Sequence, residues 1–180
     1  MISFDIHFHS PFRISSGLAA PGVDAAVDPQ QPIPESSIKG VMRAGAVRLG
    51  VRRALIDAVF GTPSAPSPWA WQPVTFVSAP VTSRRARTPI NPQTGTVRPG
   101  ALLIAEEVWC DRAAFTIDQR LHLSADDVRT HRAVLVLAGR SVRSLGATRN
   151  RGLGWVSIAP NEPAEHDGDV DLMLSLLEAR

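Results

Sequence analysis

The sequence predicts an α+β fold, and three observations lead to this prediction. Residues 1–10 alternate between apolar and polar side chains, which is the pattern of a strand with one buried face. Residues 38–60 and the segment after Ser124 place apolar side chains at helical spacing. Short apolar runs, typical of strands, lie between and after these helical segments. Since 44% of the 180 residues are hydrophobic, the chain can bury the core of one domain.

The first third of the chain predicts a strand, a long loop and a helix. The strand has four apolar residues on one face and an open polar face formed by Ser3, Asp5, His7 and His9. Residues 11–35 are rich in Pro, Gly, Ala and Asp and predict a loop; loops of this length are typically functional or disordered. Ser36 or Ser37 is expected to cap a helix that continues from Ile38 to Phe60.

The middle of the chain predicts strands around a polar insertion. Residues 83–100 are Arg-rich with a turn signal at 91–95, and they predict an extended hairpin that projects from the body. Ser124 and Asp127 form a helix-capping pattern, with Asp where Glu or Gln is usual. Strands are expected at residues 74–80, 101–110 and 114–123.

A Gly-rich loop at 146–154, a strand at 155–159 and an acidic tail at 161–180 follow the second helix. This order of elements fits a ferredoxin-like (RRM-like) core, in which two helices cover one sheet face and the other face stays open. We therefore expect a single domain over residues 1–160, with insertions at 11–35 and 83–100.

The charged residues are dominated by arginine. Of the 19 basic residues, all except Lys39 are Arg, a side chain that binds phosphate with a planar fork and stacks on bases. A GC-rich coding bias is the alternative explanation. Cys110 is the only cysteine, which excludes a disulfide within the chain and argues against a zinc site. Because the chain begins without a leader-like segment and has no apolar run of transmembrane length, we expect a cytoplasmic protein with no membrane partner.

Two segments predict anion binding. Lys39 and Arg43 lie four residues apart on one helix face, next to Ser36, Ser37 and the free N–H groups of the helix start. In the loop 146–154, the backbone at Gly146 and Gly152 can approach a phosphate closely, while Arg149 and Arg151 supply charge. The structural alternatives are a solvated basic helix face and a simple helix-ending turn.

Four segments, taken in order, carry a resemblance to a known family. They are IPESSIKGVMR at 33–43, FG at 60–61, RTPINPQTG at 87–95 leading into GALL and Glu106-Glu107, and GATRNRGLG at 146–154. In these segments the chain resembles the RAMP superfamily of CRISPR-associated proteins and is similar to the guide-RNA-binding backbone subunits of type III effector complexes. The family pattern has Gly at the position of Glu35, which predicts a different loop conformation there.

The resemblance implies both partners and chemistry. The partners would be a guide (CRISPR) RNA, a complementary target RNA, further copies of the chain and other effector subunits. Asp24, or as second choice Asp28, would take part in cutting the target RNA, with a divalent cation such as Mg²⁺ or Mn²⁺; the alternative is an ordinary Asp in a turn. The predicted hairpin would be a thumb-like element that wedges into the guide–target duplex through Pro89 and Ile90. It would contact RNA phosphates through Arg84, Arg85, Arg87 and Arg98, and the alternative is a solvated loop.

Other functions remain open from the sequence. His7 and His9 suit acid–base cleavage of RNA, as in a stand-alone guide-processing endoribonuclease of the same superfamily. The chain is alternatively a non-catalytic structural subunit, or a ferredoxin-like domain unrelated to RNA. Trp69 and Trp71 are expected to be packed inside the protein or to form a subunit contact, with base stacking as the alternative. Glu106 and Glu107 are adjacent in a strand, so only one of them can face the interior.

Overall fold

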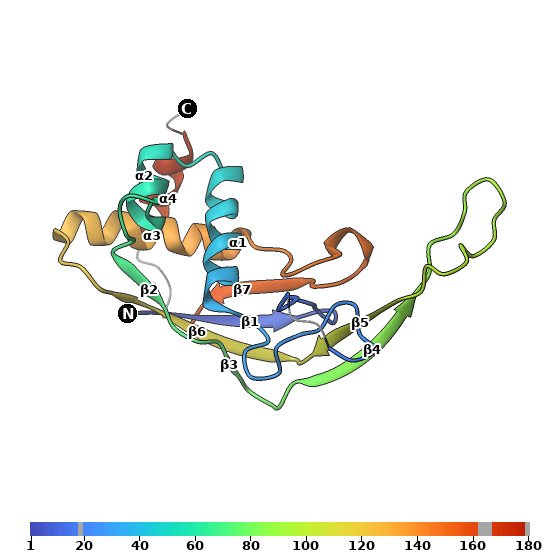
Figure 1. The fold of residues 1–180 in the computed structure, drawn as a ribbon. Helices are drawn as coiled ribbons and strands as arrows, with labels where there is room; N and C mark the ends of the chain where they lie inside the picture. Colours follow the sequence, from blue (N-terminus) through green and yellow to red (C-terminus); the bar gives the residue numbers. More distant parts are fainter. Residues whose placement is uncertain (18–19, 162–166, 179–180) are drawn as a thin grey trace.

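The main sheet of the molecule is antiparallel and is built around the N-terminal strand. Our computed structural model describes residues 1–17, 20–161 and 167–178 (Figure 1). The strand order is β2-β6-β1-β7, with β3 also paired to β6. The strands of this sheet are β1 (Ile2–Phe8), β2 (Trp69–Trp71), β3 (Thr75–Phe76), β6 (Arg112–Gln119) and β7 (Val156–Pro160).

The helices cover one face of this sheet (Figure 1). They are α1 (Glu35–Arg48), α2 (Arg53–Phe60), α3 (Ala125–Ser141) and α4 (Asp167–Glu178). Helices α1 and α2 follow β1, and α3 connects β6 to β7, so two helical crossovers join the strands of one antiparallel sheet. The predicted α+β fold is confirmed, and the strand order agrees with a ferredoxin-like core.

The core lies between β1 and the helices. Ile2, Phe4, Ile6 and Phe8 are all buried, as the alternation predicts, and the register pairs Phe4 with Phe115 of β6 in a stacked contact. Helix α3 can approach Phe4 closely because residue 139 is glycine; a Cβ there would lie 2.8 Å from the Phe4 ring. Burial of these large apolar side chains supplies the main stabilisation of the sheet–helix contact.

The expectation of a single helix over 38–60 is wrong, because a turn separates α1 from α2. Gly50 adopts φ +81°, a left-handed conformation that ends a helix. The Gly50 N–H donates to the Val47 carbonyl and the Val51 N–H to the Ala46 carbonyl, which is the Schellman pattern of a helix end. Val51 is buried behind this turn. The chain therefore reverses at Gly50 and packs α2 beside α1.

The expected helix cap at Ser36 or Ser37 is also wrong. Helix α1 begins at Glu35, and its N-cap residue is Pro34, which makes no side-chain capping bond. The Pro34 carbonyl accepts the N–H groups of Ser37 and Ile38 instead, so both serines lie in the first helical turn. At the start of α3 the capping prediction is confirmed. The Ser124 hydroxyl accepts a hydrogen bond from the Asp127 N–H and donates one to the Asp127 carboxylate.

Two further segments differ from the sequence-based expectation. The strand expected at 74–80 is confined to β3, and Pro73, which has no N–H to donate to a ladder, separates β3 from β2. The segment expected to be an acidic tail contains α4, whose Met173 and Leu176 are buried against the core. The strands expected at 101–110, 114–123 and 155–159 are present as β5 (Leu103–Trp109), β6 and β7, with each end displaced by one to four residues. None of the described helices is long and apolar enough to cross a membrane.

A two-stranded hairpin projects from the body (Figure 1). It consists of β4 (Val81–Arg87) and β5 (Leu103–Trp109), joined by residues 88–102. Glu107 of β5 is only 1% exposed, and its carboxylate binds Arg85 Nε at 3.1 Å and Arg87 Nη2 at 2.9 Å. The neighbouring Glu106 points to the other face, where it accepts the Val27 N–H. The expectation that only one of the two glutamates faces the interior is confirmed.

Strand β2 is fixed to α3 by a buried hydrogen bond. The indole N–H of Trp69 donates to Nδ1 of His131 at 3.2 Å. Because an indole N–H can only donate, Nδ1 must keep its lone pair, so the imidazole is neutral with its proton on Nε2. Burial lowers the pKa of His131, and Asp127 offsets this only in part. Trp69 is buried, and the half-buried Trp71 stacks on Phe60, so both tryptophans pack against the protein as expected.

We expect stability to fall as the pH is lowered through the ordinary pKa of histidine. The pKa of His131 is depressed in the folded state, so its contribution is complete above the unfolded-state pKa and is lost as the pH falls. The measurement is the Tm of the wild type and of His131→Gln between about pH 7.5 and pH 5. Gln can still accept the Trp69 N–H but does not titrate, so a pH dependence equal in both proteins would contradict this assignment.

We expect Glu107→Gln to cost about 3 kcal/mol of stability, because breaking a buried ion pair leaves its partners uncompensated. Glu106→Gln is the matched control: its amide oxygen can keep the Val27 hydrogen bond, and its loosely paired Arg84 partner lies 3.7 Å away and is exposed. We expect the control to lose less than about 1 kcal/mol. Denaturant titration and hydrogen exchange of the β4 and β5 amides check this, and equal losses in both variants would refute it.

Candidate functional site

The Gly-rich loop after α3 is held against the segment that follows β1. The Trp155 N–H donates to the Ser10 hydroxyl at 2.9 Å, and the Gly154 N–H donates to the Pro11 carbonyl at 2.7 Å. Further along the segment, the Ala147 N–H donates to the Arg13 carbonyl at 2.8 Å. These bonds fix both ends of the loop to residues next to the central strand, so the loop has a defined position on the sheet.

The glycines of this loop serve two different purposes. A Cβ on Gly146 would collide with the Arg13 carbonyl, and one on Gly154 would collide with the Leu145 carbonyl. These two glycines are therefore required by close backbone approach within the protein. Gly152 also has positive φ (+80°), but nothing lies within 4 Å of its missing Cβ. Of the three, only Gly152 leaves its backbone open to a ligand.

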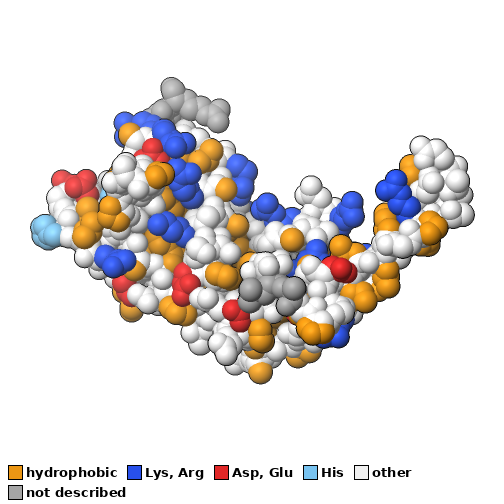
Figure 2. Space-filling view, in the orientation of Figure 1, with side chains coloured by type: hydrophobic (Ala, Val, Ile, Leu, Met, Phe, Trp, Pro, Cys, Tyr) orange, Lys and Arg blue, Asp and Glu red, His pale blue; other side chains and the backbone are white. Residues whose placement is uncertain are grey.

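The loop presents Arg149 and Arg151 to solvent. Both belong to a short 3-10 turn, between Thr148 and Gly152, which each have left-handed backbone conformation. Both guanidinium groups are exposed, and neither pairs with an acidic side chain in the part of the chain that the structure describes. Lys and Arg side chains gather over this loop and over α1 and α2, on the side toward which the hairpin tip turns (Figure 2).

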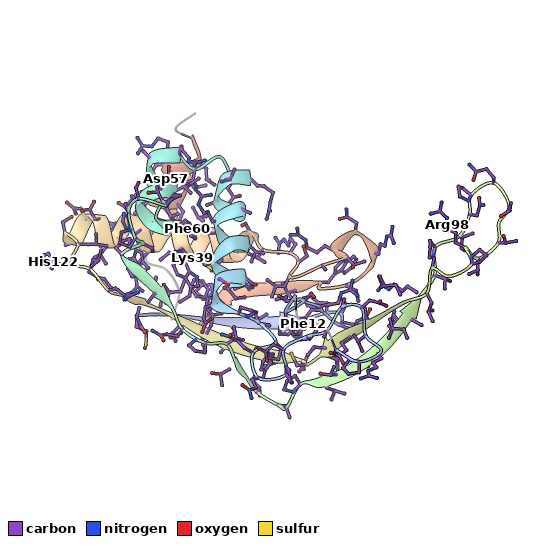
Figure 3. All side chains as sticks on the ribbon, in the orientation of Figure 1. Phe12, Lys39, Asp57, Phe60, Arg98 and His122 are labelled. Carbon is purple, nitrogen blue, oxygen red and sulfur yellow. The ribbon has the colours of Figure 1, made fainter. Side chains whose placement is uncertain are left out.

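The two predicted basic residues of α1, Lys39 and Arg43, are partly exposed and interact with neighbouring side chains. Lys39 Nζ lies 5.2 Å from the centre of the Trp71 ring, and its pKa is lowered by burial and by the charge of Arg43. Arg43 Nη2 donates to the Asp57 carboxylate of α2 at 3.0 Å. Lys39 and Asp57 face the contact between α1 and α2 (Figure 3). Ser36 remains exposed at the helix start.

The arginines of β4 are partly neutralised by β5. Glu107 binds Arg85 and Arg87, and Glu106 lies 3.7 Å from Arg84. The side chains of Arg84 and Arg85 are still about 60% exposed, whereas that of Arg87 is mostly covered. Beyond them, Arg98 lies in the distant loop of the hairpin (Figure 3). The net positive charge at the base of the hairpin is therefore smaller than the number of arginines implies.

Both candidate catalytic aspartates make structural hydrogen bonds. The Asp24 carboxylate accepts the Ile104 N–H of β5 at 2.7 Å, and the Asp24 N–H donates back to the Ile104 carbonyl. Asp24 thereby lies along one edge of β5, while the arginines of β4 line the other edge. Asp28 accepts the Gln30 and Gln31 N–H groups in a turn. Asp24 is exposed and has an oxygen left over; Asp28 is half-buried.

The open sheet face carries the two histidines. His7 Nε2 lies 3.1 Å from Asp111, His9 Nε2 lies 3.1 Å from the Ser157 hydroxyl, and the two rings are 4.8 Å apart. A pocket of about 310 Å³ is lined by His7 together with Asp5, Arg112 and Ser157. The described residues contain no cluster of three or more metal-ligating side chains here or elsewhere.

Sequence reasoning missed one residue of this site, Arg13. Its carbonyl holds the loop at Ala147, its Nη2 donates to the Thr148 hydroxyl at 2.7 Å, and its side chain is 8% exposed. No local pattern in the sequence marks it, because its contacts lie more than 130 positions away along the chain. The signal that was available is a charged residue between the apolar residues Phe12 and Ile14.

Comparisons with solved structures support this fold. A chain in a cryo-EM structure described as the type III-B Cmr-beta bound to cognate target RNA superposes with a TM-score of 0.71 at 12% identity, covering 95% of this chain and 98% of that chain. A chain in the apo state of the type III-B Cmr-beta gives a TM-score of 0.72 at 12% identity, covering 90% and 97%. At such identities the likeness shows a shared fold. No curated protein matches the sequence.

The sequence itself matches a family model. The model is described as the RAMP superfamily, and it matches residues 5–157. The match begins in β1 and ends in β7, so it includes the sheet, the hairpin and the loop 146–154. The chain belongs to the RAMP superfamily.

Proposed function

We propose that this protein is a CRISPR RNA-binding backbone subunit of a type III-like effector complex. The observation that carries the proposal is the loop 146–154, which presents two exposed arginines without acidic partners on a turn fixed to the sheet. Exposed guanidinium groups beside an open, left-handed backbone form an anion-binding concavity suited to phosphates. Membership of the RAMP superfamily and the fold shared with a chain of the type III-B Cmr-beta bound to cognate target RNA support it.

Recognition in this proposal depends on RNA shape and charge. The arginines contact backbone phosphates, and base pairing between guide and target supplies the sequence specificity. Several copies of the chain line up head to tail along one guide RNA, beside other effector subunits, in an assembly whose length the RNA sets. The complex acts in the cytoplasm without a membrane partner.

The β4–β5 hairpin is assigned the thumb-like role in this assembly. Its tip carries exposed Ile90, which is paired with Val97, and the exposed Arg98. An apolar side chain at the end of a projecting element suits insertion between base pairs. Because Glu106 and Glu107 compensate the arginines of the hairpin base, the tip and the exposed faces of Arg84 and Arg85 provide its RNA contacts.

Target cleavage is assigned to Asp24. One Asp24 oxygen is bound to the Ile104 N–H, which orients the carboxylate and leaves the other oxygen for a ligand. Mg²⁺ typically uses one or two carboxylates together with substrate phosphates, so a single exposed carboxylate fits this ion or Mn²⁺. A bound cation would stabilise charge at the scissile phosphate, while Asp24 positions the attacking 2′-hydroxyl or the ion.

A stand-alone guide-processing endoribonuclease is the second candidate. The observation that favours it is the pairing of His7 with Asp111, which orients one imidazole, beside a second imidazole 4.8 Å away. Two histidines at this separation suit general acid–base cleavage of RNA without a metal ion. A purely structural subunit, with neither activity, is the remaining alternative.

We expect Arg149→Ala/Arg151→Ala to weaken guide-RNA binding and to change its salt dependence. If each arginine neutralises one phosphate, the slope of log K against log [salt] becomes shallower by about 1.4 for single-stranded RNA. Fluorescence anisotropy over a salt series measures this. The control Arg52→Ala/Arg120→Ala removes the same charge from exposed positions at the start of α2 and after β6. An equal loss of RNA affinity in both double variants would mean that the loop makes no specific contact and that only the net charge of the protein matters.

We expect Asp24→Asn to lower target-RNA cutting by the assembled complex by about 100-fold or more, the scale of a lost acid–base group. Asn keeps an oxygen to accept the Ile104 N–H, so the fold and RNA binding should be retained. Asp28→Asn is the control: Asn preserves its turn, and cutting should be unchanged.

The outcomes separate the candidates. Loss of cutting in Asp28→Asn but not in Asp24→Asn moves the assignment to Asp28. Cutting that persists in excess chelator and disappears in His7→Ala assigns RNA cleavage to the histidine pair. An assembled complex that binds guide and target but cuts neither identifies a structural subunit.

A further inference from the structure

Arg13 carries a buried charge that the protein does not compensate. Among the residues that the structure describes, Nη1 of Arg13 is the only buried side-chain nitrogen or oxygen without a hydrogen-bond partner. The other terminal nitrogen, Nη2, donates to the neutral hydroxyl of Thr148 at 2.7 Å. No described carboxylate pairs with this guanidinium. The arginine side chains that bind Asp57, Glu106 and Glu107 are all more exposed than Arg13.

Such a group is costly in a folded protein. A guanidinium does not lose its proton, so it cannot escape burial by becoming neutral. Burial of an unpaired charge disfavours the folded state by several kcal/mol, and buried charges are therefore normally paired. Most other arginines of the chain are at the surface, so the burial of Arg13 is an exception among them. The position of Arg13 thus points to an anionic group that arrives from outside.

The place of Arg13 indicates where that group binds. Its backbone carbonyl accepts the Ala147 N–H, and its side chain holds Thr148, whose φ of +60° is unusual for a residue with a Cβ. Arg149 and Arg151 follow directly in the same turn. The guanidinium group of Arg13 therefore contacts a turn that also carries two exposed arginines.

We propose that Arg13 is a positioning residue for a backbone phosphate of the bound RNA, which docks on the turn 148–151 and compensates the buried charge. This inference rests on the proposed function and adds the buried member of its binding site. The phosphate need not contact Nη1, since in the low dielectric of the interior a charge acts across the turn. The free protein accepts an unfavourable charge, and RNA binding removes that cost.

This arrangement makes an opposite prediction for the free and the bound protein. Arg13→Met keeps a long apolar side chain but removes the charge. We expect the Tm of the free variant to equal or exceed that of the wild type, because an uncompensated buried charge is gone. We expect its affinity for guide RNA to fall by about 10- to 100-fold, the scale of one charge–charge interaction across the turn. Thermal unfolding and RNA anisotropy measure the two effects.

Two further variants separate charge from shape. Arg13→Lys keeps the charge without the planar fork, and most of the RNA affinity should remain. Arg13→Gln keeps a hydrogen-bond donor near Thr148 but removes the charge, so its RNA affinity should fall as far as that of Arg13→Met. RNA affinity that is retained in Arg13→Gln, or lost equally in Arg13→Lys and Arg13→Met, would overturn the electrostatic role.

The failures are distinguishable. A free Arg13→Met protein that is clearly less stable than the wild type, or does not fold, would make Arg13 an ordinary structural side chain. Wild-type and Arg13→Met proteins that bind guide RNA equally would refute this inference and leave the proposed function intact. A wild type that binds no guide RNA would refute the proposed function itself.

Discussion

The central strand β1 determines where every other part of the molecule lies. It is hydrogen-bonded to β6 along one edge and to β7 along the other. Its four apolar side chains are buried on the sheet face against which the helices pack. The segment that leaves β1 then binds the loop 146–154 at Pro11 and Arg13, and binds β5 at Phe12 through a pair of backbone hydrogen bonds with Val108. The loop and the hairpin are therefore both attached to the short segment after β1, although they are far apart along the chain.

The sequence predicts elements well where one local pattern dominates. Period-two alternation identified β1, and the serine–aspartate pair identified the start of α3. The break at Gly50 was overlooked because the apolar stripe of 38–60 continues across it, although a glycine with a buried residue after it is a signal of a helix end. Likewise, the spacing of Leu172, Met173, Leu176 and Leu177 is helical, and the acidic residues before it concealed this.

The candidate site was harder to predict because charge compensation is a tertiary property. From the sequence, Arg85 and Arg149 are equivalent exposed arginines. In the structure, Glu107 compensates Arg85, whereas Arg149 has no described acidic partner. Lys39 illustrates the same point, since its contact with Trp71 joins residues of α1 and β2. Composition indicates how many basic residues a chain has, but only the fold decides which of them keep their charge available for a ligand.

The loop at the end of the hairpin is held by its own hydrogen bonds, whereas the loop 146–154 is held by contacts with other parts of the protein. Every turn hydrogen bond of residues 88–102 closes within that segment, such as Asn91 N–H to the Thr96 carbonyl and Arg98 N–H to the Pro89 carbonyl. The loop 146–154, by contrast, is fitted against Arg13 and Leu145 at two glycines. Insertions and deletions are thus tolerated in one loop and excluded from the other. Descendants of this protein can lengthen or shorten the reach of the hairpin while the rest of the molecule stays unchanged.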